Sequence, residues 1–252
     1  MQESSFGSSD SATLEDEDAM IDLYYWPTPN GRKASIMLEE CGISYKTIAI
    51  NIGRGDQFSA EFLAISPNNR IPAIVDHDAS ISLFESGAIL SYLAEKTGKF
   101  MPEDLSGRYE VMQWLFWQMG NLGPMAGQLS HFVNYAPDPV PYAHDRYERE
   151  YDRLLGVMNT RLDDREYLAG DYSIADIASF PWVMSYKRLG ADLDKFASLR
   201  RWFDAIKVRP AAQRGAALGS DWRREELTDE AARKVLFGQT AESIAAAAKE
   251  DR

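Results

Sequence analysis

Two polar residues, Thr28 and Asn30, could stabilise a reactive sulfur, because they lie close together in a short segment, residues 26–31, that is rich in proline and glycine. A hydroxyl and a side-chain amide can each donate a hydrogen bond to a thiolate, but neither is itself a sulfur nucleophile. The alternative is that residues 26–31 only form a turn and bind nothing.

The chain contains one cysteine, Cys41. A single thiol excludes a disulfide within the chain, a CxxC motif and a zinc site ligated by several cysteines. Cys41 also falls on the apolar face of a predicted helix, with Ala34, Met37 and Leu38, so we expect it to be buried. Any sulfur redox chemistry of this chain therefore needs a small molecule that brings the sulfur.

A second group of polar residues could bind a carboxylate. Glu85 and Ser86 precede a predicted helix, so the Ser86 hydroxyl and the positive end of the helix dipole could receive an anion. Arg70 can pair with a carboxylate through two hydrogen bonds, and Gln57 flanks the same edge. The alternatives are a plain helix cap at Glu85 and Ser86 and an arginine that serves only solubility.

The dipeptide Ile71-Pro72 begins a predicted strand. A cis bond before Pro72 would turn the preceding N–H and C=O towards an open edge, where an extended peptide could pair with them. An ordinary trans proline at the first position of a strand is the alternative. The sequence by itself leaves both interpretations open.

The predicted elements between residues 20 and 98 follow the order βαβαββα. A strand, a helix and a strand in succession indicate a parallel pair with a right-handed crossover, and the last two strands indicate an antiparallel hairpin. This order brings residues 26–31, 69–72 and 85–86 to one edge of the sheet, where open α/β sheets bind ligands. The expected strands are residues 21–25, 45–50, 71–76 and 81–84, and the expected helices are residues 60–65, residues 85–97 and the segment that ends at Gly42.

Helical periodicity dominates the rest of the chain, so the predicted fold class is an α/β domain followed by an all-α domain. Ser173 and Asp176 predict a capping box, with Tyr172 and Ile177 placed for a hydrophobic staple. The expected helices are residues 107–121, 141–162, 174–188 and 199–208. The expected domains are a disordered acidic tail at 1–19, an α/β domain at 20–98, a helical domain at 104–218 and an extension at 219–252.

The composition limits the partners. A net charge of −12 repels phosphate backbones and anionic lipids, so we expect neither nucleic-acid nor membrane binding. No stretch approaches the roughly 18 to 20 apolar residues that span a bilayer. Residues 1–19 lack the basic and apolar regions of a secretory signal, which predicts a cytoplasmic protein. The three histidines fall at no ligand spacing, so we predict no metal site.

Four separated motifs resemble the glutathione S-transferases, and residues 28–31 together with 114–119 resemble the bacterial Nu class, which has disulfide-bond oxidoreductase activity. The resemblance implies a thioredoxin-like N-terminal domain, a cis bond at Pro72, a helical C-terminal domain and a homodimer. It also implies glutathione, reduced and oxidised, as cosubstrate. The four motifs are residues 25–31, 66–74, 83–89 and 172–177.

The resemblance also implies site residues. Thr28 and Asn30 would face the glutathione sulfur, where other classes have a serine, a cysteine or a tyrosine, and this departure argues against conjugation as the main task. Arg146 would reach a glutathione carboxylate, either in its own subunit or across the dimer. The residues implied to bind glutathione, with the neighbouring Arg70 and Pro72 included, are Asn30, Gln57, Arg70, Ile71, Pro72, Glu85, Ser86 and Arg146.

The expected reaction is disulfide reduction, in which a bound glutathione thiolate attacks a small disulfide and a second glutathione resolves the mixed disulfide. One alternative is glutathione chemistry on an aromatic thioether, as in the breakdown of lignin-derived ethers. Another is a regulator that binds glutathione without turnover. Aromatic residues that could receive an aromatic guest are Trp114, Phe116, Trp117, Phe132 and Tyr135.

Overall fold

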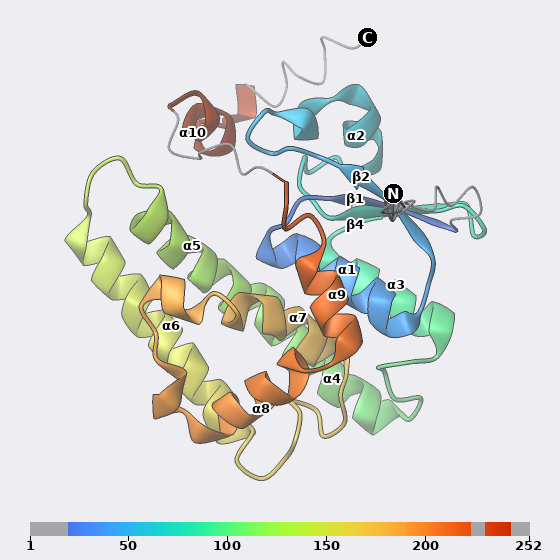
Figure 1. Ribbon diagram of the computed structural model, residues 1–252, viewed down its shortest axis with the longest axis vertical. Coiled ribbons are helices and arrows are strands. Elements are labelled where there is room, and N and C mark those ends of the chain that lie inside the picture. The colour runs from blue at the N-terminus through green and yellow to red at the C-terminus, as the bar shows by residue number, and fades with distance from the viewer. Residues whose placement is uncertain (1–19, 223–229, 243–252) are drawn as a thin grey trace, which may run out of the picture.

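The computed structural model describes residues 20–222 and 230–242, so the expected tail at residues 1–19 lies outside the described residues. Its first part is a mixed four-stranded sheet with the strand order β2-β1-β3-β4 (Figure 1). β1 pairs with β2 in parallel and with β3 antiparallel, and β3 and β4 form the antiparallel hairpin. The predicted βαβαββα order is therefore confirmed. The strands are β1 (Ile21–Tyr25), β2 (Tyr45–Ala49), β3 (Ala73–Asp76) and β4 (Ile81–Phe84).

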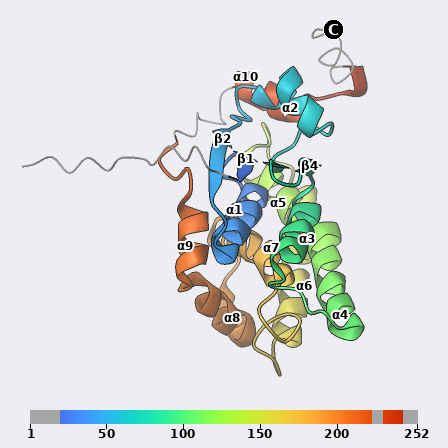
Figure 2. The same cartoon turned by 90° about the vertical axis from the view of Figure 1, so that its right-hand side faces the viewer.

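Helices cover both faces of this sheet, because successive side chains of a strand point to opposite faces. Leu23 and Tyr25 of β1 join the main core with α1 and α3, whereas Tyr24 packs with Phe62 of α2 on the other face. Figure 2 shows α1 between α3 and α9. The helices of this part are α1 (Pro29–Cys41), α2 (Ala60–Ile65) and α3 (Ser86–Thr97), and a 3-10 turn, η1 (Asp56–Phe58), precedes α2.

Local chemistry sets the ends of these elements. Thr28 caps α1, and Gly42 ends it with a φ of 73°, a left-handed conformation that glycine adopts without strain. β3 begins at Ala73, two residues later than predicted, because the preceding Pro72 has no N–H for the ladder. The Ile71–Pro72 bond is cis, as the family resemblance implies.

The second part of the chain is helical, as predicted. Three helices were not predicted: α5 and α9, whose first turns contain a proline that can also end a helix, and α10, which lies in the expected extension. The helices are α4 (Leu105–Trp117), α5 (Gly123–Asn134), α6 (Pro141–Arg161), α7 (Ile174–Val183), α8 (Ala197–Lys207), α9 (Pro210–Ala217) and α10 (Glu230–Phe237), and a π-helical turn, η2 (Gln118–Leu122), joins α4 to α5.

The predicted helix at residues 174–188 is wrong in its second half. α7 ends at Val183, and a 3-10 turn, η3 (Tyr186–Leu189), follows it. Pro181 lies inside the last turn of α7, where it lacks the N–H that an α-helix needs and crowds the preceding turn. None of the helices among the described residues has both the length and the apolar character needed to cross a membrane.

A buried carboxylate anchors α7 in the core. Asp176 forms the predicted capping box with Ser173, and its carboxylate also accepts hydrogen bonds from Leu168 N at 2.9 Å and Trp202 Nε1 at 2.8 Å. Burial raises the pKa of Asp176 to about 6 in opposition to these bonds. Each carboxylate oxygen of Asp176 accepts hydrogen bonds from two donors. An N–H group in place of either oxygen would therefore face donors and not acceptors.

We therefore expect Asp176→Asn to lower the free energy of unfolding by about 3 kcal/mol, because an amide must turn its NH₂ towards two buried donors. Urea denaturation at pH 8, where Asp176 is ionised, measures the change. Asp138→Asn is the control, since Asp138 is exposed before α6 and should shift the free energy by less than about 0.5 kcal/mol. Equal stability of the two variants would contradict the anchoring role of Asp176.

Candidate active site

Thr28 lies between the end of β1 and the first turn of α1. Its Oγ1 accepts a hydrogen bond from the Gly31 backbone N–H at 3.1 Å, which fixes the side chain as the cap of the helix. A hydroxyl that accepts one hydrogen bond keeps its own proton to donate. Thr28 can therefore cap α1 and donate to a ligand in the adjoining cavity at the same time.

Asn30 is oriented by a tryptophan from the helical part of the chain. Its Oδ1 accepts a hydrogen bond from Trp182 Nε1 at 3.0 Å, and an indole N–H is only a donor. The oxygen end of the amide is thus held at Trp182 of α7, and the Nδ2 end is left to donate elsewhere. Thr28 and Asn30 both line one cavity, so the structure brings the two predicted donors together.

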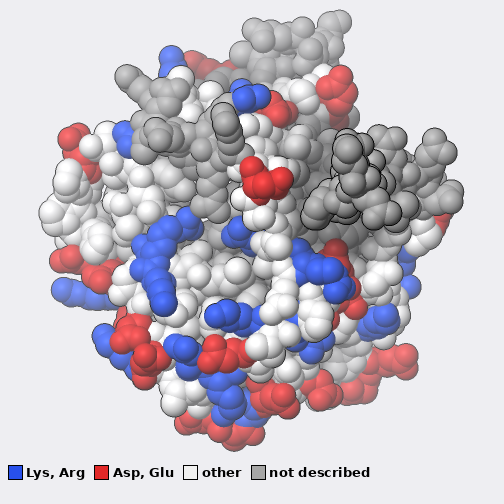
Figure 3. Space-filling view, in the orientation of Figure 1, with Lys and Arg blue, Asp and Glu red and all other residues white. Residues whose placement is uncertain are grey.

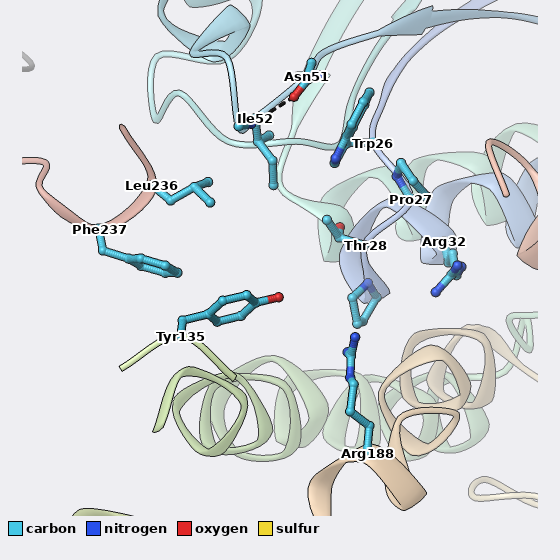
Figure 4. Close-up of a pocket in the computed structure, with 12 residues that line it drawn as sticks. Trp26, Pro27, Thr28, Arg32, Asn51, Ile52, Tyr135, Arg188, Leu236 and Phe237 are labelled. Atoms are coloured by element: carbon cyan, nitrogen blue, oxygen red, sulfur yellow. Dashed lines mark hydrogen bonds between the residues drawn. The ribbon is translucent and has the colours of Figure 1, made fainter. Parts of the chain in front are cut away.

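Two adjoining hollows of about 220 Å³ and 330 Å³ form this cavity. They lie between the sheet edge at the Thr28 loop, the end of α5 and α10 (Figure 4). Figure 4 shows Tyr135, Phe237 and Arg188 approaching Thr28 from different elements. The residues common to both hollows are Thr28, Pro29, Ile52, Leu236 and Phe237.

α10 closes one side of the cavity and connects the two parts of the chain. The Phe237 ring lies 4.6 Å from the His131 ring and 5.4 Å from the Tyr135 ring, measured between centroids. Beyond the helix, Gln239 Oε1 accepts a hydrogen bond from Arg70 Nη1 at 2.9 Å. The expected extension therefore contributes residues to the site, which its weak amphipathic pattern did not indicate.

Three more of the predicted binding residues line the same cavity: Gln57, Arg70 and Ile71. Gln57 is 2% exposed, and its Nε2 donates to the Ile52 carbonyl at 3.2 Å. Its Oε1 has no hydrogen-bond partner within the described part of the chain. A buried acceptor without a partner is costly, so this oxygen is suited to receive an N–H from a ligand.

The other predicted residues lie outside the lining of the two hollows. Glu85 occupies the N-cap position of α3 with a φ of 71°, and its side chain makes no cap hydrogen bond. Strain of this kind, worth about 1–3 kcal/mol, is typical of functional sites. Ser86 begins α3 and is buried, and Pro72 is buried next to Ile71. Arg146 is exposed on α6, 3.8 Å from Glu150.

Three arginines and no acidic residue occur among the described residues that line the cavity. Arg32 comes from α1, Arg70 from the sheet edge and Arg188 from η3. Figure 3 shows basic side chains across the middle of the face that Figure 1 presents, and many acidic side chains along the lower rim of that face. A cavity with a local excess of positive charge, in a chain of net charge −12, is suited to a ligand that bears carboxylates.

The aromatic residues expected to receive an aromatic guest are mostly placed elsewhere, which corrects the prediction. Trp114, Phe116 and Trp117 line a separate surface groove along α4, and Phe132 stacks on Tyr147. Only Tyr135 of the expected set lines the cavity at Thr28. Sequence periodicity predicts that a segment is helical, but it does not fix which cavity each face borders.

A cluster of potential metal ligands occurs at the start of α6, where His144 Nδ1 lies 3.6 Å from Asp145 and 3.8 Å from Glu148. The spacing of the histidines in the sequence does not indicate this cluster, because two of its members are carboxylates. Exposed groups of this kind also occur without a metal, and none of the three lines the cavity at Thr28. The absence of a metal site stays a prediction.

Both parts of the chain match the models of a known protein family. Residues 19–95 match the family model of the glutathione S-transferase N-terminal domain, and residues 132–210 match that of the C-terminal domain. The disulfide-bond oxidoreductase YfcG of Escherichia coli (strain K12) is 52% identical over 216 residues, which are 83% of this chain and 100% of that protein.

Solved structures are similar over most of the chain. A glutathione transferase from Burkholderia graminis, with two glutathione molecules bound per subunit, has a TM-score of 0.75 at 45% identity and covers 79% of this chain and 88% of its own. A glutathione transferase from Pseudomonas putida, with one glutathione disulfide bound per subunit, has a TM-score of 0.75 at 42% identity. The match covers 81% of this chain and 93% of that chain.

Proposed function

Because the chain belongs to the glutathione S-transferase family, we propose that it reduces small disulfides with glutathione held beside Thr28 and Asn30. The observation that carries the proposal is the pair of donors at one cavity, with Asn30 oriented by Trp182. The buried Gln57 Oε1, which has no hydrogen-bond partner among the described residues, and the three arginines suit the amide and carboxylate groups of a peptide such as glutathione.

The proposed reaction needs two glutathione molecules, because the chain supplies no thiol at Thr28. A bound glutathione thiolate attacks one sulfur of the substrate disulfide and releases the other as a thiol after protonation. A second glutathione thiolate then attacks the glutathione sulfur of the mixed disulfide and releases the second substrate thiol. The products are two thiols and oxidised glutathione. The relatives with two glutathione molecules or one glutathione disulfide bound support this stoichiometry.

Positioning, more than acidification of the thiol, must supply the rate. A thiol of pKa ~8.5 is about 3% ionised at pH 7, and lowering the pKa by ~2 units makes about three quarters of it thiolate. That roughly 25-fold gain shrinks to about threefold, because nucleophilicity falls with basicity at a Brønsted slope of about 0.45. The main task of Thr28 and Asn30 is therefore to hold the glutathione sulfur in line with the disulfide.

We also propose that the chain is cytoplasmic and forms a homodimer in which Arg146 reaches the glutathione bound by the partner subunit. The two proposed domains are residues 20–98 and 104–218. An exposed apolar stripe on α4 supports the dimer, because its members recur at helical spacing on the surface. In that arrangement α4 would face the second copy. The stripe consists of Leu105, Tyr109 and Phe116, exposed by 74%, 62% and 64%.

Steady-state turnover of a small disulfide tests the proposed function. With glutathione present, and with glutathione reductase and NADPH reporting oxidised glutathione, we expect one oxidised glutathione for each disulfide reduced. An aromatic thioether is the comparison substrate, because Trp26, Tyr135 and Phe237 give the cavity aromatic walls. Turnover of the thioether alone would favour the thioether reaction, and glutathione binding without turnover of either would favour a regulator.

A further inference from the structure

A lysine is buried one helical turn beyond Asn30. Lys33 of α1 is 1% exposed, and its Nζ lies 2.7 Å from Gln118 Oε1, 3.5 Å from Ser86 Oγ and 3.6 Å from Met119 Sδ. Among the described residues it forms no ion pair with a carboxylate. Lys33 thus connects the helix that carries Asn30 to the first residue of α3.

Stability does not explain a lysine at this position. An ammonium group buried without an anionic partner is unfavourable, and an apolar side chain of similar volume is often neutral or stabilising in its place. Burial lowers the pKa of Lys33 to about 7, against an opposing attraction from Glu85. A titratable group with such a shift is typical of a functional position when its contacts also connect it to a site.

The partners of Lys33 extend to the Thr28 cavity. Gln118 is fully buried in η2, and its Nε2 has no hydrogen-bond partner in the described ranges 20–222 and 230–242. A Cβ built at Gly123 would lie 2.9 Å from Gln118 Nε2 and 3.3 Å from Trp182 Nε1, so these two side chains border the same glycine. Trp182 in turn orients Asn30. The π-helical turn therefore places Gln118 next to both Lys33 and the glycine that borders Trp182.

The Ser86 hydroxyl has a proton that it can donate in a hydrogen bond to a ligand. Because Ser86 Oγ accepts from Lys33, its own proton points elsewhere, and in the structure it faces Met119 Sδ at a weak 3.7 Å. A carboxylate at the first turn of α3 is a far better acceptor than a thioether sulfur. Such a carboxylate would also benefit from the helix dipole and from the ammonium charge beneath it.

We propose that Lys33 is a positioning residue for the carboxylate-binding end of the glutathione site: it holds the Ser86 hydroxyl ready to donate and places a positive charge under the N-terminus of α3. The inference rests on the proposed function and assigns a role to a residue that lines neither hollow. It also makes ligand affinity depend on the protonation of one buried amine.

Glu85 is the charged group that acts on Lys33. Among the described residues, the other elements packed around Lys33 add no further charged group that acts on it. η2 has no titratable side chain, and Asp176 of α7 is bonded to Ser173, Leu168 and Trp202. In α3, Tyr92 and Lys96 are bonded to Asp76, and Glu95 is paired with Arg108.

The sign of the pH dependence follows from linkage. A ligand carboxylate favours protonated Lys33, so binding above pH 7 takes up a proton and weakens as the pH rises. We expect the dissociation constant to increase about five- to tenfold between pH 6.5 and 8.5, the change produced by a shift of roughly one pKa unit on binding.

Titration calorimetry with S-methylglutathione tests the proposal, because this probe has no thiol that titrates. The wild-type protein, Lys33→Met and a control, Lys99→Met, are compared at several pH values. Lys99 donates to the Cys41 carbonyl at the opposite end of α1 and should not affect binding. We expect Lys33→Met to bind about tenfold more weakly at pH 6.5 and to lose the pH dependence, and Lys99→Met to match the wild type.

Two results would overturn the role of Lys33. One is a wild-type affinity that does not change with pH, which needs no variant to be folded. The other is a folded Lys33→Met variant with wild-type affinity and slope. Lys33→Gln, a polar replacement for Lys33, gives a second variant if Lys33→Met fails to fold. Failure of the wild-type protein to bind any form of glutathione would instead overturn the proposed function, so the two failures are distinguishable.

Discussion

Asn30→Ala is expected to lower kcat/KM for disulfide reduction by about a hundredfold, because a displacement of roughly 1 Å at a reacting atom has an effect of this size. The substitution removes the amide that faces the cavity and leaves the Trp182 indole N–H without its acceptor. The glutathione sulfur is then free to occupy positions that are out of line with the disulfide. Initial rates with a small disulfide and saturating glutathione measure the loss.

Cys41→Ala is the matched control for this prediction. Cys41 is 6% exposed and lies 3.6 Å from Thr97 Oγ1, and burial raises the pKa of its thiol, so it makes a poor nucleophile. The variant should keep most of the activity. If Cys41→Ala were inactive while Asn30→Ala remained active, the reactive sulfur would belong to the chain and the proposed reaction would be wrong.

Gly31→Ala should abolish most of the activity, with a loss of more than about a hundredfold. A Cβ at Gly31 would lie 2.2 Å from the Trp26 carbonyl oxygen and 3.0 Å from the Tyr25 ring. The Tyr25 ring belongs to the end of β1, and the Trp26 carbonyl belongs to the backbone directly after it. The first turn of α1 must therefore move, and it takes Thr28 and Asn30 with it.

A second glycine provides the control for this substitution. Gly156 lies inside α6, and a Cβ there would meet nothing within 4 Å. Gly156→Ala should leave the activity unchanged and raise the free energy of unfolding by about 1 kcal/mol, because alanine favours a helix interior. Wild-type activity in Gly31→Ala would show that the close approach of the Thr28 loop to α1 does not position the donors.

The strands of the fold were predictable because local signals agree with the tertiary structure there. Alternating apolar residues define β1, and Gly42 ends α1 through its left-handed conformation. Two of the missed helices, α5 and α9, have a proline in the first turn, where a proline is tolerated, and the end of α7 at Val183 depends on Pro181. Proline marks both the start and the end of helices, so its position alone did not decide between them.

The site was predictable where its residues come from the loops at the sheet edge. Thr28, Asn30, Gln57 and Ile71 line one cavity, as the order of the strands indicates. Trp182 and the residues of α10 could not be found, because they reach the cavity only through tertiary packing. Lys33 is a similar case. It occurs three and four residues before Ile36 and Met37 on a buried face, where the sequence shows only an interruption of the apolar pattern.

Titration of the Cys41→Ala variant with reduced and with oxidised glutathione tests most directly whether the reactive sulfur is supplied by a bound tripeptide. Without Cys41 the chain has no thiol, so any heat of association reports binding that does not depend on a cysteine. We predict saturable binding of both redox forms, with affinities equal to those of the wild-type protein. The absence of binding heat in both forms would contradict the account.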